Sequence, residues 1–499
     1  MSDQPPAPSG SAHPPTRDIV LSSKHRWRAY WVAVAVAALT ILDLTKVNVA
    51  LPSIEAALNA GPTELQLVVS GYILTFGLVL VPAGRLGDLR SRRVLFLVGL
   101  SLFLVTSLAC ALAPNTGVLL VARLLQGVAA GIQMPQVLGL VQQLFQGKER
   151  GRAFGLFGAT IGIATAFGPT LGGLLIALGG ETDGWRLIFW INIPLVAIVI
   201  ALAAWLLPDT RTKSRRKLDL DPVGVLLFAL TILALMWPFL FTTGAPGDDP
   251  RRWWLLVVSV VFAAGFVFWE RRYADRGGMP LMPFSIFGLS SYRNGVLIST
   301  AYFAAIPAMF LLGTLFLQGG LGLEPVFAGM VTIGFAVASA WSSWIGGNLV
   351  TRLGRPLVVW GILGMVATAA GLVLVALFTA PEWTPWAMAG VMVVGGFAGG
   401  LVISPNQTLT LADIPVTSGG VAGSVGQLGQ RIGTAVGTAI ALALFYATVY
   451  REQDTADMTV VYHDAYASGM ITVGVFLGIA LIVGVGDLAG RARSGSQTP

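Results

Sequence analysis

A carboxylate and an ammonium group stand three residues apart inside a long apolar run, at Asp43 and Lys46. An ionised side chain at the centre of a bilayer costs about 2.5–3.5 kcal/mol on insertion scales, so such residues pair or serve a function. Spaced in this way on a helix, the two share one face and can form an ion pair. The pair is either structural, near the outer end of the helix, or it is a proton or substrate site in a central cavity. Asn48, two residues further on, is included in the candidate cavity.

The proton affinity of Asp43 is subject to two opposite effects. Lys46 favours the ionised carboxylate, whereas burial in an apolar helix favours the protonated acid. The sequence leaves open which effect is larger. In either case, protonating Asp43 would break the pair and remove a buried charge, which is a way to couple proton binding to a change in helix packing.

Two further cations lie in apolar runs. Arg123 is followed by Gln126 and Gly127, and an arginine inside a helix bundle needs a partner. Gly127 and Gly131, four residues apart, allow close contact with a neighbouring helix. For Arg431 two interpretations remain even: hydrogen bonds to backbone carbonyls, or a place in the cavity.

A short charged turn, residues 83–93, separates the second and third apolar runs and leaves no room for a domain. It contains two glycines, one acid and four arginines. Because arginines collect in cytoplasmic loops, the turn must join two membrane helices at the cytoplasmic face. Its candidate functional positions are Gly84, Arg85, Gly87, Asp88, Arg92 and Arg93.

The composition is that of a membrane protein. Only 11% of the 499 residues are charged and 55% are hydrophobic, whereas about 25% of a soluble domain is charged. Apolar runs near 20 residues long recur along the chain, which predicts an all-α polytopic membrane protein. The net charge of +7 reflects cytoplasmic loops rather than nucleic-acid binding. One cysteine and three scattered histidines indicate no internal disulfide and no metal site, and no cofactor is expected.

We predict fourteen membrane spans with both termini in the cytoplasm. Lysines and arginines are concentrated in the loops on the side of the N-terminus, and moving the count by one span would reverse that bias downstream. The spans are 29–51, 65–83, 93–113, 117–141, 152–178, 186–207, 222–242, 252–270, 294–317, 326–350, 356–379, 385–405, 418–448 and 467–489.

The charged turn has a second, weaker copy. Residues 347–357 align with residues 84–94 at an offset of 263, which also places the first span on the ninth. This predicts two six-helix lobes with two spans inserted between them. The second copy has Thr351 in place of Asp88. The predicted parts are a disordered cytoplasmic tail (1–28), an N-terminal lobe (29–207), a basic cytoplasmic loop (208–221), two inserted spans (222–270), a cytoplasmic linker (271–293), a C-terminal lobe (294–489) and a cytoplasmic tail (490–499).

The fifth span carries small residues at intervals of four around a proline. The proline removes one backbone hydrogen bond and permits a kink, while the small residues make a flat packing face. Any tightly packed membrane helix is the alternative explanation. The residues concerned are Gly158, Gly162, Gly168, Pro169, Gly172 and Gly173.

These motifs resemble the major facilitator superfamily, and within it the fourteen-span drug:proton antiporter family. The charged turn, the run from Arg123 in the fourth span and the glycines around Pro169 follow the family's order. The runs 184–194 and 427–433 are also similar to the sixth and thirteenth spans of that family. The resemblance covers about residues 28–490.

The resemblance implies a major facilitator fold and proton-coupled export of small amphipathic compounds, such as drugs or antibiotics, by alternating access. It implies that Arg123 faces Asp43 in a coupling site that also takes in Gln126. It further implies that Asp88 packs against the start of the thirteenth span, around residues 418–420, as a gate that holds the outward-open state. The glycine motif of the fifth span is associated with export. Lys46 departs from the family, which usually has an apolar residue there, so neutral or anionic substrates are expected over cationic ones.

Two other functions stay open: a dedicated exporter of one endogenous metabolite, lipid or siderophore, and an integral-membrane enzyme. An enzyme would need acidic or histidine clusters on sizeable loops, and the loops here are short. A nucleotide-driven pump would need a phosphate-binding loop that the sequence lacks. We expect a monomer in the plasma (inner) membrane whose partners are the substrate, protons and lipids. Acids near predicted span ends are expected to be solvated, namely Glu324, Glu382, Asp413 and Asp487.

Overall fold

The computed structural model describes residues 22–208, 221–242, 248–452 and 457–495, and these contain helices and no strand. Fourteen helical segments are long and apolar enough to cross a membrane, the number that the sequence predicts. The α-helices are α1 (Ser23–Leu58), α2 (Pro62–Leu89), α3 (Arg92–Ala111), α4 (Thr116–Leu144), α5 (Gly147–Trp190), α6 (Asn192–Leu206), α7 (Pro222–Leu240), α8 (Trp254–Asp275), α9 (Ser290–Leu315), α10 (Pro325–Met330), α11 (Ile333–Leu353), α12 (Arg355–Phe378), α13 (Thr384–Thr410), α14 (Gly419–Glu452) and α15 (Met458–Gly495). Short turns η1 (Pro250–Trp253), η2 (Phe284–Gly288), η3 (Phe316–Gly320) and η4 (Val416–Ser418) flank them.

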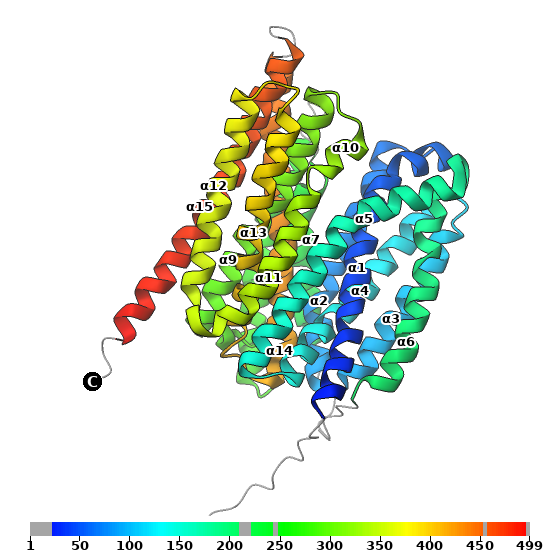
Figure 1. Ribbon diagram of the computed structural model, residues 1–499. Helices are drawn as coiled ribbons and strands as arrows, with labels where there is room; N and C mark the ends of the chain where they lie inside the picture. The colour runs from blue at the N-terminus through cyan, green and yellow to red at the C-terminus, as the bar shows by residue number, and fades with distance from the viewer. Residues whose placement is uncertain (1–21, 209–220, 243–247, 453–456, 496–499) are drawn as a thin grey trace, which may run out of the picture.

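The helices pack as two groups. Helices α1 to α6 contact one another, and α9 to α15 form the second group. Figure 1 shows α1, α3, α5 and α6 on one side and α9, α12, α13 and α15 on the other. The groups meet where α5 lies against α11 and where α2 lies against α14. Helices α7 and α8 pair with each other, and α7 contacts both α2 and α14.

Helix α5 includes parts of two membrane spans. Helix α5 runs through the fifth span and into the sixth, and its backbone leaves helical geometry at Gly180, where φ is +83°. Glycine adopts this left-handed region without a steric penalty. The membrane-spanning segments accordingly divide into Gly147–Gly180 and Asp183–Leu206.

The helix at the N-terminal end is longer than its apolar run. We expected a disordered tail through residue 28, but α1 begins at Ser23, where the Ser22 hydroxyl accepts a hydrogen bond from the backbone N of His25 at 3.3 Å. Arg26 then forms an ion pair with Glu149 of α5 at 3.1 Å. Hydropathy marks the part of a helix that lies in the membrane, whereas capping and side-chain pairs decide where the helix ends.

At the other end α15 continues to Gly495, while its membrane-spanning part ends at Gly490, the residue at which the cytoplasmic tail was predicted to begin. The expected tail through residue 21 and the basic residues 209–220 lie outside the described residues.

Two close helix crossings join the groups. A Cβ atom added to Gly84 of α2 would lie 2.7 Å from the backbone oxygen of Gly420 in α14, and one added to Gly347 of α11 would lie 2.6 Å from that of Gly151 in α5. Gly84 and Gly347 are equivalent positions in the two copies of the charged turn. Both crossings lie at the end of the molecule that carries Asp88, which we call the Asp88 end.

Candidate functional site

Asp43, in the middle of α1, is fully buried and has two cations around it. Arg123 of α4 places Nη1 2.8 Å from Asp43 Oδ2, and Lys46 places Nζ 3.6 Å from Asp43 Oδ1. Arg123 is 0% exposed and Lys46 is 1% exposed. The pairing expected within α1 and the contact that the resemblance implied with α4 are therefore both present.

Asn192, the first residue of α6, completes this group and was not among the predicted site residues. Its Nδ2 donates to Asp43 Oδ1 at 2.7 Å, and its Oδ1 accepts from Lys46 Nζ at 2.5 Å. Asn192 therefore holds the carboxylate and the ammonium at once. Asn192 lies in the run 184–194, and the similarity of that run to the family's sixth span is the sequence signal that could have identified it.

A second layer of polar side chains fixes Arg123. Arg123 Nη1 also donates to Gln126 Oε1 at 2.7 Å, and Gln126 Nε2 donates to Ser107 Oγ of α3 at 2.8 Å. Asn192 Nδ2 reaches the same hydroxyl at 3.3 Å. Helices α1, α3, α4 and α6 are thus joined through one hydrogen-bonded network, which we call the Asp43 network (Asp43, Lys46, Ser107, Arg123, Gln126 and Asn192).

Aromatic rings of α2 face the two buried arginines. The Arg123 guanidinium lies 4.2 Å from the ring centroid of Tyr72, and the Arg431 guanidinium of α14 lies 4.8 Å from that of Phe76. Cation–π contacts of this kind stabilise a charge that has few polar partners. Gly127 allows the approach, because a Cβ there would lie 2.4 Å from the backbone oxygen of Tyr72.

The arrangement leaves polar capacity unused in the interior. Arg123 Nη2, the Tyr72 hydroxyl and Arg431 Nε are buried without a hydrogen-bond partner among the described residues. The network holds one carboxyl group and two basic groups, so it carries one net positive charge when all three are ionised. Asn48, predicted to belong to the cavity, is exposed and outside this network.

The glycines of the fifth span face two different helices. A Cβ on Gly168 would lie 1.8 Å from Thr45 Oγ1, and one on Gly172 would lie 3.0 Å from the backbone oxygen of Lys46. Gly158 lies near Ser343 of α11 instead. The first two glycines therefore set the packing of α5 on the segment of α1 that carries Lys46.

The remaining positions of this motif have fewer close contacts. A Cβ on Gly162 would come within 3.8 Å of Ala336 in α11, and a Cβ on Gly173 would have nothing within 4 Å. Pro169 lies inside α5 and is exposed.

Asp88, near the C-terminal end of α2, bonds to the start of α14 in the other group. Its Oδ1 and Oδ2 accept from the backbone N of Gly420 and Val421, each at 2.9 Å. Carboxylates are favoured at a helix N-terminus, where the first N–H groups lack partners within the helix. The contact expected around residues 418–420 is thus present, shifted by one residue.

Arg92 of α3 strengthens this contact. Its Nη2 lies 2.7 Å from Asp88 Oδ1 and donates to the backbone oxygen of Val416 at 2.9 Å, while Nη1 donates to Gly139 O of α4 at 2.7 Å. Asp88 and Arg92 therefore hold α2, α3, α4 and the start of α14 together.

The other residues of the turn have separate roles. Gly87 packs against the Gln136 side chain, 2.0 Å from an added Cβ. Arg93 donates to the backbone oxygen of Ala204 in α6. Arg85 interacts electrostatically with Asp88 and with Glu270 of α8.

The second copy of the turn forms a different ion pair, and one expectation about it is wrong. Arg355 Nε lies 2.6 Å from Asp487 Oδ2 of α15, and both side chains are at most 2% exposed. We expected Asp487 to be solvated because it lies close to the cytoplasmic end of the last predicted span. The helix instead continues past it and turns this carboxylate inward to Arg355. Thr351, at the position equivalent to Asp88, is exposed.

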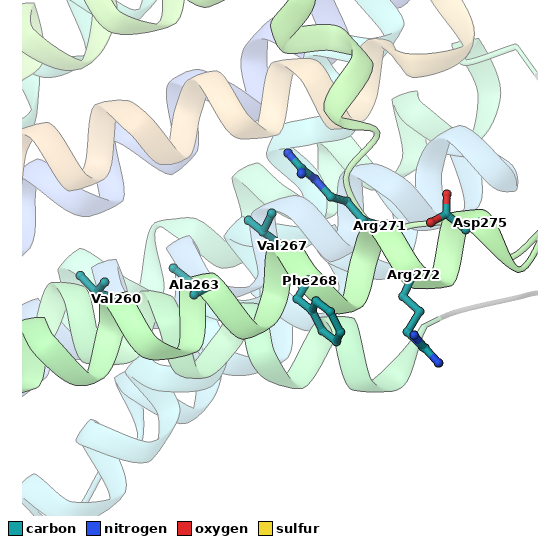
Figure 2. A pocket seen from close by; sticks show the side chains of 8 residues that line it. Val260, Ala263, Val267, Phe268, Arg271, Arg272 and Asp275 are labelled. Carbon is teal, nitrogen blue, oxygen red and sulfur yellow. The ribbon is translucent and has the colours of Figure 1, made fainter.

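A groove lies apart from these networks, on the outer face of α8. Val260, Val267, Phe268 and Arg271 are among its lining residues, which all belong to that helix. Figure 2 shows their side chains along one helix, next to Arg272 and Asp275. A groove formed by a single helix has no opposite wall, so it is not the enclosed cavity expected of a substrate site.

Comparison with known proteins defines the class of the protein. The family model of the Major Facilitator Superfamily matches residues 33–438. The chain therefore belongs to the major facilitator superfamily. Solved structures with the same fold include the human organic anion transporter MFSD10 (13% identical, TM-score 0.65, covering 92% of this chain and 99% of that one) and the proton:xylose symporter XylE (16%, TM-score 0.61, covering 93% and 95%). At this identity they show the fold alone.

Curated relatives are exporters and resistance proteins. The probable actinorhodin transporter of Streptomyces coelicolor is 32% identical over 434 residues, 85% of this chain and 73% of the relative. The multidrug resistance protein Stp of Mycobacterium tuberculosis is 36% identical over 321 residues, 63% and 57%. The tetracenomycin C resistance and export protein of Streptomyces glaucescens is 31% identical over 356 residues, 70% and 64%. The match spans less than two thirds of the latter two proteins. These relatives are consistent with the drug:proton antiporter family.

Proposed function

We propose that this multi-pass membrane transporter is a proton-coupled exporter of small amphipathic compounds such as drugs or antibiotics, working by alternating access. The observation that carries the proposal is Asp43, a fully buried carboxylate held by Arg123, Lys46 and Asn192 in the N-terminal group. Ionisable residues buried within membrane helices mark proton or substrate pathways. The names of the curated relatives support small-molecule export as the activity.

The proton acts on the packing of three helices. With Asp43 ionised, its carboxylate holds α1 to α4 through Arg123 and to α6 through Asn192. Protonation of Asp43 removes the anion from between two cations, so the attraction that joins these helices weakens. Export then couples to the proton because substrate and proton bind to different arrangements of the same helices.

Export rather than uptake is proposed from the glycine motif of the fifth span, which the resemblance associates with export, and the packing of this helix links it to the Asp43 network. Gly168 and Gly172 pack α5 onto Thr45 and Lys46, so a change at Asp43 is transmitted directly to α5. Helix α5 also contacts α11 in the other group. It is therefore placed to pass a change in the Asp43 network to the interface between the groups.

The net charge of the Asp43 network bears on the substrate. Two cations and one carboxylate leave one positive charge before any proton binds, and a second positive charge appears when Asp43 is protonated. A cationic substrate near this network would be repelled in both states. We therefore propose that neutral or anionic amphipathic compounds are preferred.

The Asp88 end forms the closed gate of the outward-open state. Hydrogen bonds between the groups at this end run from Asp88 to α14, from Arg92 to Val416, and from Arg150 to Ala412. We place this end in the cytoplasm, because its loops collect arginines. On this proposal the protein is a monomer in the plasma (inner) membrane with both ends of the chain in the cytoplasm.

A dedicated exporter of one endogenous metabolite is the second candidate. It is favoured by relatives named for single natural products, actinorhodin and tetracenomycin C. A substrate screen that finds export of one compound class alone would favour it over multidrug export.

The test is export from proteoliposomes with an imposed pH gradient. Asp43→Asn keeps the size of the side chain and removes its charge, and we expect export that no longer depends on the gradient. Asp183→Asn is the matched control, because Asp183 is an exposed acid that forms an ion pair with Arg186 on the surface. An unchanged gradient dependence in Asp43→Asn would remove this residue from the mechanism.

Proton release on substrate addition, measured with cationic, neutral and anionic compounds, tests the charge preference. Lys46→Leu should improve the response to cationic compounds. A wild-type protein that already prefers cations would contradict the role of Lys46.

A further inference from the structure

Two buried carboxyl groups meet at the base of the inserted helices, outside the networks described above. Asp221, the N-cap residue of α7, is 3% exposed, and Glu270, near the end of α8, is 0% exposed. Asp221 caps its helix by accepting from the backbone N of Gly224 at 2.9 Å. Glu270 Oε2 accepts from the backbone N of Met282 at 3.1 Å, which fastens the linker between α8 and α9 to the end of α8.

The two carboxyl groups face each other across Gly224. An added Cβ on that glycine would lie 2.4 Å from Asp221 Oδ2 and 2.4 Å from Glu270 Oε1, so the two oxygens border the same small space. They can share a hydrogen bond only when one carboxyl group carries a proton, because ionised carboxylates only accept.

The environment of Glu270 Oε1 also favours a proton on one of the two carboxyl groups. This atom is buried, and no donor among the described residues reaches it. The neighbouring Trp269 indole donates to Asp221 instead, at 2.9 and 2.8 Å from its two oxygens. A buried carboxylate oxygen without a donor is costly, and two buried carboxylates in contact do not both stay ionised.

The charged surroundings of the pair are uneven. Arg85 of α2 interacts electrostatically with Glu270 and with Asp88. On α8 itself, Arg271 and Arg272 are exposed and line the groove of Figure 2 rather than the pair. The linker contributes backbone N–H groups of Leu281 and Met282 to Glu270. Within the described residues 22–208, 221–242, 248–452 and 457–495, Arg85 is shared with another acid and does not neutralise two carboxylates.

We infer that Asp221 and Glu270 hold one proton between them and form a proton-binding site separate from the Asp43 network. With the proton bound, the pair carries a single negative charge, and α7, α8 and the linker stay packed together. Loss of the proton leaves two like charges in contact, which pushes the helices apart and pulls Arg85 away from Asp88. The site therefore lets proton concentration at the Asp88 end act on the gate. This last consequence rests on the proposed gate, whereas proton binding by the pair does not.

Infrared difference spectroscopy of the purified full-length protein tests proton binding directly. The protonated carboxyl group has a C=O stretching band that ionised carboxylates lack. We expect Glu270→Gln and Asp221→Asn each to remove one such band at neutral pH. Asp43→Asn should leave that band in place, so the result does not depend on the proposed coupling site. Glu149→Gln, an exposed acid paired with Arg26, is the matched control and should also retain it.

The outcomes separate clearly. A band that persists in either folded pair variant overturns the inference. If Glu270→Gln fails to fold, Asp221→Asn decides the question alone.

The effect on the gate is measured in the Asp43→Asn background, as the distance between spin labels on α2 and α14 at the Asp88 end. That distance should increase as pH rises, and Glu270→Gln should abolish the change. A persisting pH dependence in Glu270→Gln would disconnect the pair from the gate.

Discussion

The two copies of the charged turn share a glycine contact and an arginine hydrogen bond, and they differ in which helix supplies the acid. In each copy a glycine, Gly84 or Gly347, touches the backbone of the opposite helix group. In each copy the arginine also donates to a side-chain amide oxygen of a later helix. Arg92 donates to Gln143 in α4 at 3.3 Å, and Arg355 donates to Asn406 in α13 at 2.6 Å. These amides are again 263 residues apart.

The acids make the difference. In the first copy Asp88 comes from the turn itself and bonds to backbone N–H groups in the opposite group. In the second copy the acid is Asp487, which comes from α15 within the same group as Arg355. A bond between groups must break when the groups move, whereas a bond within a group moves with it. The comparison therefore assigns gating to the first copy and rigidity to the second.

The largest effect on transport is expected from Asp88→Asn. The amide is similar in size but loses its charge against Arg92 and presents one donor to the N–H groups of α14. Breaking a buried ion pair costs about 3–5 kcal/mol, and the ion pair with Arg92 lies within one helix group, so the melting temperature should fall as well. Export per folded molecule should be lost while expression is retained, because the hydrogen bonds from α14 to Asp88 join the two groups. Full export by this variant would refute the gate.

Asp487→Asn should cost a free energy comparable to that of Asp88→Asn, but it should lower stability without abolishing export. Arg355 would be left buried without its counter-charge, and the free energy of unfolding should fall by about 3–5 kcal/mol. The melting temperature in detergent measures this loss. Export per folded molecule should remain. Lost export at an unchanged melting temperature would make the second copy a gate as well, and the distinction would fail.

Gly84→Ala and Gly347→Ala should resemble each other, because this is where the copies are alike. Each added methyl group meets the opposite backbone at less than 3.0 Å, and overpacking of this kind costs about 1–3 kcal/mol. Spin-label distances between the groups should increase by similar amounts in both variants. Gly426→Ala is the control, since a Cβ there meets nothing within 4 Å.

Thr351→Ala should have the smallest effect. The side chain is exposed, and surface substitutions without a partner usually change stability by within about 0.5 kcal/mol. Export and melting temperature should both match wild type. A loss of export would mean that the second copy retains a gating contact despite lacking an acid.

Much of the charged site could be anticipated from residue type and spacing. Asp43 and Lys46 pair because helix geometry places residues three apart on one face, whatever surrounds them. The cost of burying Arg123 required a partner, although only family resemblance indicated Asp43. Asn192 was not predicted because it lies 149 residues from Asp43 in the chain, so their contact carries no local signal.

The misses share a cause. Asp487 was taken as solvated because hydropathy tells where a helix leaves the apolar layer, not which way each side chain faces. The carboxyl pair of Asp221 and Glu270 joins two helices and depends on Gly224 for its close contact. Such contacts depend on how the helices rotate against each other, and that rotation is set by packing along their whole length.

The sequence by itself determined that this chain crosses a membrane fourteen times, that it is built from a repeat, and that a few charges must be buried. Hydrophobic length and the cost of an unpaired charge in hydrocarbon are local properties, so they can be taken from the residues one span at a time. Only the tertiary structure decided which carboxylate meets which cation, and whether that pair lies within one helix group or between two. That choice arises from contacts between residues far apart in the chain, where neither hydropathy nor spacing acts.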